Sequence, residues 1–426
     1  MHSNHDPGDV DRLFRAEAAR AVATLGRVFN DFDRAEDAVQ DAYAIALARW
    51  PRFGVPKNPA GWIMLTARNR AIDRLRRERL AAEKGEILSK LEALSQLDST
   101  VEENPLDDRL AMIFAACHPA LSDETRIALT LRYAAGLTVA EIAAALLTSQ
   151  ATIAQRLVRA KQKIRRAGIA FAVPDVAYLP ERLHDVLHVI YLIFNEGYAS
   201  STHASRVRDE LCDEALRLAH LLDELLPNQS EIAGLYALML FHDARRQARV
   251  TTSGDLVLLE NQDRSLWDSE KILRGVALLA RDATANCGPY RLQAMIAAEH
   301  ARAENWKATD WRRIHRCYDL LLAIDPSPVV ELNRAVAVAY AEGPETGLGL
   351  INELAAGGIL DEYAPLFSAR AELLRRVHRS EEARAAYERA IELTRNEPER
   401  RFLQQKLAEV MGEPRGRVVA SPNRST

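Results

Sequence analysis

The chain has 426 residues, enough for two or three domains, and its hydrophobic share of 48% with only 6% aromatic residues favours a helical protein over a β-rich one. A net charge of −4, taken alone, excludes a uniformly basic nucleic-acid binder. The charge is uneven, however, because residues 1–170 hold 25 Lys and Arg against 22 Asp and Glu, whereas the remainder holds 31 against 38.

The cysteines form no C-x-x-C pair, so the sequence predicts neither a disulfide framework nor a zinc site; they are Cys117, Cys212, Cys287 and Cys317. No apolar run is long enough to span a bilayer, and the first residues lack the apolar core of a signal peptide. We therefore expect a cytoplasmic protein with no membrane contact, no metal and no cofactor.

Residues 10–79 form the first helical block. Within this block, AEDAVQDAYAIALARW predicts a helix whose acids Glu36, Asp37 and Asp41 stand in front of small and apolar residues, namely Ala38, Ala42, Ile45 and Ala46. Such a segment can be a docking surface for a basic partner or an ordinary capped amphipathic helix.

The same block ends in an arginine-rich helix. Asn58 and Pro59 supply its N-cap and first turn, and the spacing predicts that Trp62, Leu65, Ile72 and Leu75 are buried. The opposite face carries Arg68, Asn69, Arg70, Arg74, Arg76 and Arg77. Arginine and asparagine can contact base edges, and a tryptophan can stack on an unpaired base. The alternative is a solvated helix face over a buried tryptophan.

Residues 80–106 are an acidic linker in this reading, although SKLEALSQL could form a transient helix. Residues 107–170 then form a second helical block of the size of a small helix-turn-helix domain. Gly136 ends one helix, and Thr138 with Glu141 makes a capping box that begins the next.

A polar turn, Thr148 to Gln150, precedes a helix with an apolar face of Ile153, Leu157 and Ile164. Its other positions carry basic residues, and the segment contains no acidic residue that could pair with them. We therefore expect these side chains to be unpaired and to bind phosphates; they are Arg156, Arg159, Lys161, Lys163, Arg165 and Arg166.

Residues 175–410 are predicted to be a helical extension, and 411–426 a disordered tail. The segment GDLVLLENQDRSLWD could be a loop or a hairpin. Tyr318 and Tyr387 are 69 residues apart, close to twice the ~34-residue period of tetratricopeptide helix pairs. Leu332 and Phe367 stand where that motif typically has tryptophan, so we expect tetratricopeptide-like pairs only from about residue 310.

His184 and His188 have the i, i+4 spacing of two metal-binding imidazoles, with Glu196 or His203 as a conceivable third ligand. The intervening residue is Asp185, not the glutamate of an H-E-x-x-H motif, and structural histidines are the better interpretation.

Three segments together resemble the extracytoplasmic-function (ECF) group of sigma-70 family RNA polymerase sigma factors. AEDAVQDAYAIALARW resembles region 2.2, NPAGWIMLTARNRAIDRLRRER resembles regions 2.3 to 2.4, and LSDETRIALTLRYAAGLTVAEIAAALLTSQATIAQRLVRAKQKIR resembles region 4. Further segments, among them LHDVLHVIYLIFNEGYASS, resemble the subgroup with a long C-terminal tetratricopeptide-like extension. That subgroup implies no dedicated anti-sigma factor.

The resemblance implies an all-α protein: a region 2 domain at 10–79, the linker, a region 4 helix-turn-helix domain at 107–170 and the extension. Its partners would be core RNA polymerase, double-stranded promoter DNA and the opened −10 strand. The core-binding residues would be Glu36, Asp37, Val39, Gln40 and Asp41. The −10 contacts would be Lys57, Asn58, Trp62, Arg68, Asn69, Asp73, Arg74, Arg76 and Arg77. The −35 contacts would be Gln150, Thr152, Gln155, Arg156, Arg159, Lys161, Lys163 and Arg165.

Two departures from the family pattern are visible. The loop FGVPKNP, expected to hold a flipped −10 base, is shorter and richer in proline than the usual acidic version, and Ala151 replaces a common glycine. The extension either folds onto the basic DNA-binding faces, receives a regulatory protein or contacts polymerase. The other hypotheses are a helix-turn-helix regulator with a helical sensor domain and no polymerase role, and a metal-dependent enzyme using the histidines.

Overall fold

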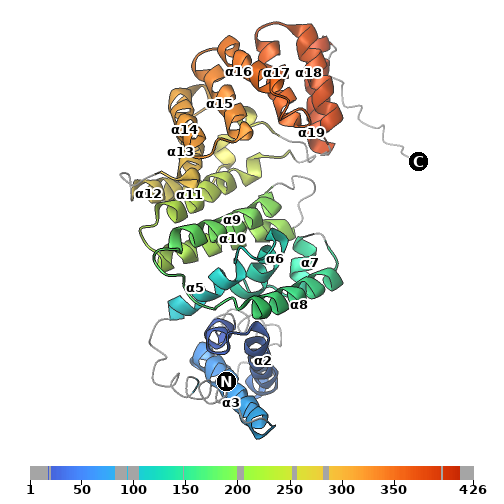
Figure 1. Cartoon of the computed structure of the whole chain (residues 1–426). Helices are drawn as coiled ribbons and strands as arrows, with labels where there is room; N and C mark the ends of the chain where they lie inside the picture. Colours follow the sequence, from blue (N-terminus) through green and yellow to red (C-terminus); the bar gives the residue numbers. More distant parts are fainter. Residues whose placement is uncertain are drawn as a thin grey trace, which may run out of the picture. The chain divides into compact units, whose positions relative to one another are not determined.

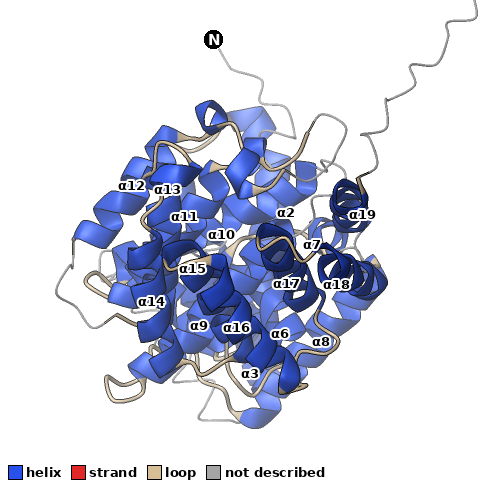
Figure 2. Cartoon of the chain, turned by 90° about the horizontal axis from the view of Figure 1, so that it is seen from above, coloured by secondary structure: helices blue, strands red, loops and turns tan. Residues whose placement is uncertain are grey.

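The computed structural model describes residues 18, 21–81, 94, 105–146, 148–198, 206–251, 257–281, 287–394 and 397–412. Of the predicted linker 80–106, residues 80–81 and 105–106 are helical, and the rest, apart from Leu94, lies outside the described residues, as does the predicted tail beyond 412. Every long element in the described part is a helix, and no β-strand occurs there (Figure 2), which confirms the all-α class. The chain divides into two compact units, Met1–Ala199 with Ser205–Pro227 and Ser200–Ala204 with Asn228–Thr426.

The first unit opens with α2 (Phe32–Phe53) and α3 (Pro59–Ala81), which pack against each other (Figure 1). Asp31 is the N-cap of α2, and Gly54, with a φ of 83°, ends it. The buried face of α3 consists of Ile63, Ala67, Ala71 and Leu75. Of the predicted face, Leu75 is buried and Trp62 and Ile72 are half-buried, but Leu65 is 46% exposed; Ile63 and two alanines, which the apolar pattern overlooked, complete the contact.

The helix-turn-helix block consists of α5 (Pro105–Ala116), α6 (Asp123–Leu129), a π-helical turn η1 (Thr130–Ala134), α7 (Val139–Ala145) and α8 (Gln150–Ala167). The predicted capping box at Thr138 and Glu141 is present, and Gly136 has the positive φ that ends the preceding helix. Ser149 caps α8, and the predicted apolar face of Ile153, Leu157 and Ile164 is buried.

Two further helices, α9 (Leu179–Tyr198) and α10 (Arg206–Leu225), belong to the first unit. They pack on each other and on α5. In addition, α9 packs on α6, and α10 packs on α7. Arg182 donates to the Phe114 carbonyl at 2.7 Å, and Arg217 donates to the Ala134 carbonyl at 3.0 Å. The division of the chain by compactness therefore falls at 227, whereas the sequence analysis placed the start of the extension at 175.

The second unit begins with α11 (Ser230–Ala244), α12 (Ser269–Ala280) and α13 (Pro289–Arg302), with α11 buried on nearly all sides. Gly234 lets α13 approach, because a Cβ there would lie 2.6 Å from the Arg291 nitrogen. Between α11 and α12, residues 257–268 form a loop with two 3₁₀ turns, so a hairpin is not found in the described part of that segment.

The rest of the second unit is a series of helix pairs: α14 (Trp311–Ile324), α15 (Pro328–Ala341), α16 (Pro344–Ala356), α17 (Ala364–Arg376), α18 (Ser380–Leu393) and α19 (Glu397–Met411). Each helix packs on the next. The first helices of successive pairs start 33 and 36 residues apart, close to the tetratricopeptide period. The pairs begin at Trp311, where the sequence predicts them.

Candidate nucleic-acid interface

Helix α8 presents the polar face that the sequence predicts for DNA contact. Its N-terminal residues Gln150, Thr152 and Gln155 are exposed, and so are Arg159 and Lys163 further along. Arg159 and Lys163 have no ion-pair partner among the described residues. Arg156 is an exception, because its guanidinium lies 2.9 Å from Glu124 of α6. The N-terminal turns of α8 therefore remain open to solvent in this conformation.

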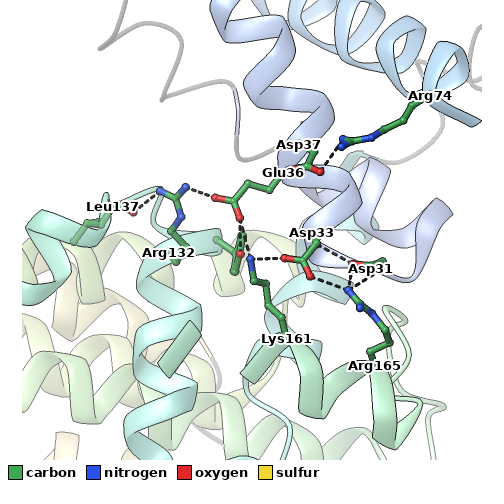
Figure 3. Close-up of polar contacts among 10 residues, drawn as sticks. Asp31, Asp33, Glu36, Asp37, Arg74, Arg132, Leu137, Lys161 and Arg165 are labelled. Carbon is green, nitrogen blue, oxygen red and sulfur yellow. Dashed lines mark hydrogen bonds and ion pairs between the residues drawn. The ribbon is translucent and has the colours of Figure 1, made fainter. Parts of the chain in front are cut away.

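The C-terminal half of α8 is paired with acids from α2, as Figure 3 shows. The ammonium of Lys161 lies 2.5 Å from Asp33 and 3.5 Å from Glu36. The guanidinium of Arg165 lies 2.7 Å from Asp33 and 3.1 Å from Asp31. The prediction that these basic side chains are unpaired was wrong for Lys161 and Arg165. Their partners are carboxylates that lie more than a hundred residues away in the sequence.

Glu36 is the centre of this acidic cluster, which comprises Asp31, Asp33 and Glu36. Its carboxylate accepts from Arg132 and, at 2.9 Å, from the Tyr133 hydroxyl (Figure 3 draws the Arg132 contact). Burial by itself raises the pKa of Glu36, but Arg132, Lys161 and Tyr133 outweigh burial, and the pKa lies below its ordinary value. Burial, with Glu36 alongside, raises the pKa of Tyr133. The cluster thus holds a charged Glu36.

An apolar contact accompanies these ion pairs. Phe32 of α2 is 2% exposed and stacks on Tyr133 of η1 with ring centroids 4.3 Å apart. Phe171, which follows α8, meets Phe32 edge-on at 4.3 Å. The Phe171 amide donates to the Asn30 side chain at 3.0 Å. The two predicted sigma-like blocks are therefore joined by a packed seam as well as by charge.

The predicted core-binding residues divide into two groups. Glu36 is half-buried in the acidic cluster, and Val39 is 5% exposed in the helical core. Asp37, Gln40 and Asp41 are exposed, and Asp37 lies 2.7 Å from Arg74 of α3. In this conformation only the second group is open to a partner.

The predicted −10 residues gather on the outer face of α3 and the loop before it. Most of them are exposed, namely Lys57, Asn58, Asn69, Asp73, Arg74, Arg76 and Arg77. Arg68 is half-buried. Trp62 is also half-buried and meets the buried Trp50 edge-on at 5.2 Å. The arginine-rich face is thus an open basic surface beside a partly accessible indole.

Sequence reasoning missed several residues of this site: Asp31, Asp33, Arg132, Tyr133 and Phe171. The acids Asp31 and Asp33 carry a local signal, since they stand at an N-cap and a first turn where carboxylates stabilise a helix. That signal explains their place on α2 but says nothing of α8. Only the folded chain brings them to the basic helix.

The histidine pair does not form a metal site with described residues. His184 is exposed, and His188 lies 3.5 Å from Asp123. The described part of the chain holds no group of three His, Cys, Asp or Glu that could bind a metal, while His203 lies outside it. The four cysteines are free thiols, and burial raises the pKa of Cys117 to about 12.

A basic helix-turn-helix joined to an arginine-rich helical block is typical of transcription factors that bind DNA. Comparison of the sequence with known protein families supports this class. Residues 13–80 match the model for Sigma-70 region 2, and residues 111–164 match the model for Sigma-70, region 4. Residues 182–283 match a family of unknown function, DUF6596. No solved structure matches the chain.

Curated relatives support the same assignment. An uncharacterised protein of Rhizobium meliloti (strain 1021) is 41% identical over 96% of this chain and 97% of its own length. The ECF RNA polymerase sigma factor SigK of Mycolicibacterium vanbaalenii is 30% identical over 36% of this chain and 78% of its own length. SigK of Mycobacterium ulcerans is 27% identical over a similar span.

The chain belongs to the ECF sigma factors and carries a long C-terminal extension. In the described residues, no helix is both long and apolar enough to cross a membrane. The family is a group of transcription initiation factors without an enzymatic reaction of its own.

Proposed function

We propose that this sigma factor binds core RNA polymerase, places α8 in the major groove of the −35 element and uses α3 with the loop before it to read and hold the opened −10 strand. The observation that carries this proposal is the open N-terminal face of α8 on a capped helix-turn-helix, in one unit with the exposed arginine face of α3. A recognition helix touches bases with its first turns, whereas phosphates are met by flanking cations.

The free chain has a closed form in this proposal. Lys161 and Arg165 face carboxylates of α2 where DNA phosphates would bind, and Glu36 is half-buried where polymerase would bind. Binding to polymerase then separates α2 from α8, because the acidic cluster exchanges its intramolecular cations for cations of the partner. Promoter affinity consequently rises only in the complex.

The extension, in this proposal, regulates the sigma-like unit or contacts polymerase. The first two of its helices, α9 and α10, support the helix-turn-helix directly, through contacts such as Arg126 with Asp185 at 3.5 Å. A regulatory role therefore falls to residues beyond 227, which form a compact unit of their own.

Run-off transcription with purified core polymerase on the promoters of neighbouring genes tests the proposal. We expect specific transcripts from the full chain and their loss when Arg156 and Arg159 are both changed to Gln. A chain ending at Pro227 would show whether the second unit represses or assists. Failure to bind core polymerase, combined with tight DNA binding, would favour a helix-turn-helix regulator without a polymerase role.

A further inference from the structure

The second compact unit contains a cavity of about 320 Å³, lined by residues of α14, α15, α17, α18 and α19 and by residues 258–260. These helices follow one another in the tetratricopeptide-like part of the chain (Figure 1). The volume lies at the lower end of the range of known ligand sites. The proposed sigma function makes no use of this cavity.

One wall of the cavity is aromatic. Trp311 and Tyr340 stack with their ring centroids 4.2 Å apart, and Trp306 meets Trp311 edge-on at 4.8 Å. Tyr387 of α18 and Phe402 of α19 add two further rings to the lining. The two faces of Tyr340 are covered by Trp311 and by the Arg376 guanidinium, so the wall offers a ligand ring edges and the remaining rings of the lining, and aromatic rings attract both apolar groups and cations.

The lining also carries three carboxylates and a single cation. Glu372 is satisfied, because the Tyr387 hydroxyl donates to it at 3.1 Å and Arg375 at 2.6 Å. Lys406 is taken up by Glu409 at 2.9 Å. Glu399 is half-buried and, like the exposed Glu260, has no hydrogen-bond or ion-pair partner among the described residues.

Glu399 loses part of its hydration without gaining a partner among the described residues. A carboxylate that loses water without gaining a partner is destabilised, and burial indeed raises the pKa of Glu399. A positively charged ligand in the cavity would supply the missing partner. The remaining Glu260 at the exposed edge adds a second negative charge.

We propose that this cavity binds the guanidinium group of an arginine residue carried on a peptide. A guanidinium is planar, so it can stack on an aromatic wall while it makes paired hydrogen bonds to a carboxylate. The same unit already uses this geometry, because the guanidinium of Arg376 lies 4.4 Å from the Tyr340 ring centre. A lysine ammonium lacks the flat face that matches the wall.

A free amino acid fits less well than a peptide. Its α-carboxylate would need a cation, and the one cation among the described lining residues, Lys406, is already paired with Glu409. A residue within a peptide carries no such charge, and its apolar neighbours can contact Val336 and Leu373 in the lining.

Isothermal titration calorimetry on the full chain tests the proposal with a Leu-Arg-Leu peptide blocked at both ends. We expect binding of this peptide, weaker binding of the lysine peptide and of free arginine, and none of the neutral citrulline isostere. Absence of binding by the arginine peptide, or equal binding of the citrulline peptide, would overturn the proposal.

Variants assign the site. Glu399→Gln keeps the shape of the side chain, so we expect it to weaken binding of the arginine peptide about tenfold or more, since hydrogen bonds to charged groups are the strong ones. The control is Glu353→Gln on α16, an exposed glutamate outside the cavity lining. Equal loss in both variants, or none in Glu399→Gln, would place the peptide elsewhere. The experiment measures peptide binding and not transcription, so a negative result would not bear on the proposed sigma function.

Discussion

The ammonium of Lys161 lies 2.5 Å from the carboxylate of Asp33, and this pair joins helix α8 to the first turn of α2. Asp33 also meets Arg165 at 2.7 Å, so one acid neutralises two cations of the helix. In the proposed function, DNA phosphates would compete with the Asp33 carboxylate for these two side chains. The proposal therefore predicts that DNA affinity depends on Asp33, an acid outside the proposed DNA-contacting residues.

Replacing Asp33 with Asn should raise the affinity of the free chain for a short DNA duplex. Partly exposed ion pairs contribute at most about 1 kcal/mol each, so the gain is expected to be about two- to tenfold. Fluorescence anisotropy at low salt measures it. Asp41→Asn is the matched control, because Asp41 is an exposed acid of the same helix with no ion pair among the described residues. Equal affinity of the two variants would contradict the competition.

The contribution of Glu36 to stability should depend on pH in a defined direction. The pKa of Glu36 is lowered in the folded chain, so its ion pairs stabilise the fold above the unfolded-state pKa, and this stabilisation is lost as the pH falls through the folded pKa. Thermal unfolding of the wild type and of Glu36→Gln should therefore differ at neutral pH and converge as the pH falls below the lowered pKa of Glu36 in the folded chain. A constant difference across that range would rule out the ionised Glu36 as its source.

Phe32 should hold the closed form together through packing. Phe32→Ala removes a buried ring that contacts both Tyr133 and Phe171, and such truncations cost about 3–5 kcal/mol. Denaturant unfolding measures the loss. Phe32→Leu keeps most of the volume and should lose much less. If hydrogen exchange of the η1 amides were unchanged in Phe32→Ala, the seam would not be closed in solution.

Much of this fold is visible in the sequence because its signals are local. The capping box at Thr138, the positive-φ Gly136 and the apolar face of α8 each depend on residues within a few positions. The buried face of α3 was predicted only in part, because Leu75 is buried as expected whereas Ala67 and Ala71 are buried as well, and an apolar pattern gives alanine little weight.

The contact between the two sigma-like blocks could not be predicted in the same way. Asp33 and Lys161 are 128 residues apart in the sequence, and local features account for the position of each. An N-terminal acid favours its own helix, and a basic face favours DNA. The ion pairs between α2 and α8 depend on the tertiary structure. They show that Lys161 and Arg165 are paired in this conformation, and the family assignment does not depend on them.

The helices α9 and α10 should be required for the helix-turn-helix block to fold. A chain ending at Pro227 keeps the contacts of Arg182 with Phe114 and of Arg217 with Ala134, whereas a chain ending at Asp175 loses both together with a buried apolar interface. One large buried apolar side chain contributes about 2 kcal/mol, so we expect the shorter chain to be several kcal/mol less stable. Circular dichroism melts of the two chains compare them; equal melting temperatures would make the boundary at 175 the correct one.

Lys163 and Arg159 should affect DNA binding in different ways, although both are exposed cations of α8 without ion-pair partners among the described residues. Lys163→Gln should weaken binding to all sequences alike and reduce the slope of log affinity against log salt by about 0.9, the signature of one lost phosphate contact. Arg159→Gln should instead cost about 1–3 kcal/mol on the −35 element and little on unrelated DNA, since it lies nearer the end of the helix that meets bases.

Anisotropy titrations over a range of salt, with duplexes that contain or lack the −35 element, separate the two effects. Arg159→Lys completes the comparison, because it keeps the charge and loses the bidentate geometry that reads guanine. It should preserve the salt slope while losing discrimination between the duplexes. The contrary result is that Arg159→Gln reduces the salt slope as much as Lys163→Gln does and still distinguishes the two duplexes. That result would show that Arg159 contacts a phosphate and not a base, and it would contradict the proposed orientation of α8 in the groove.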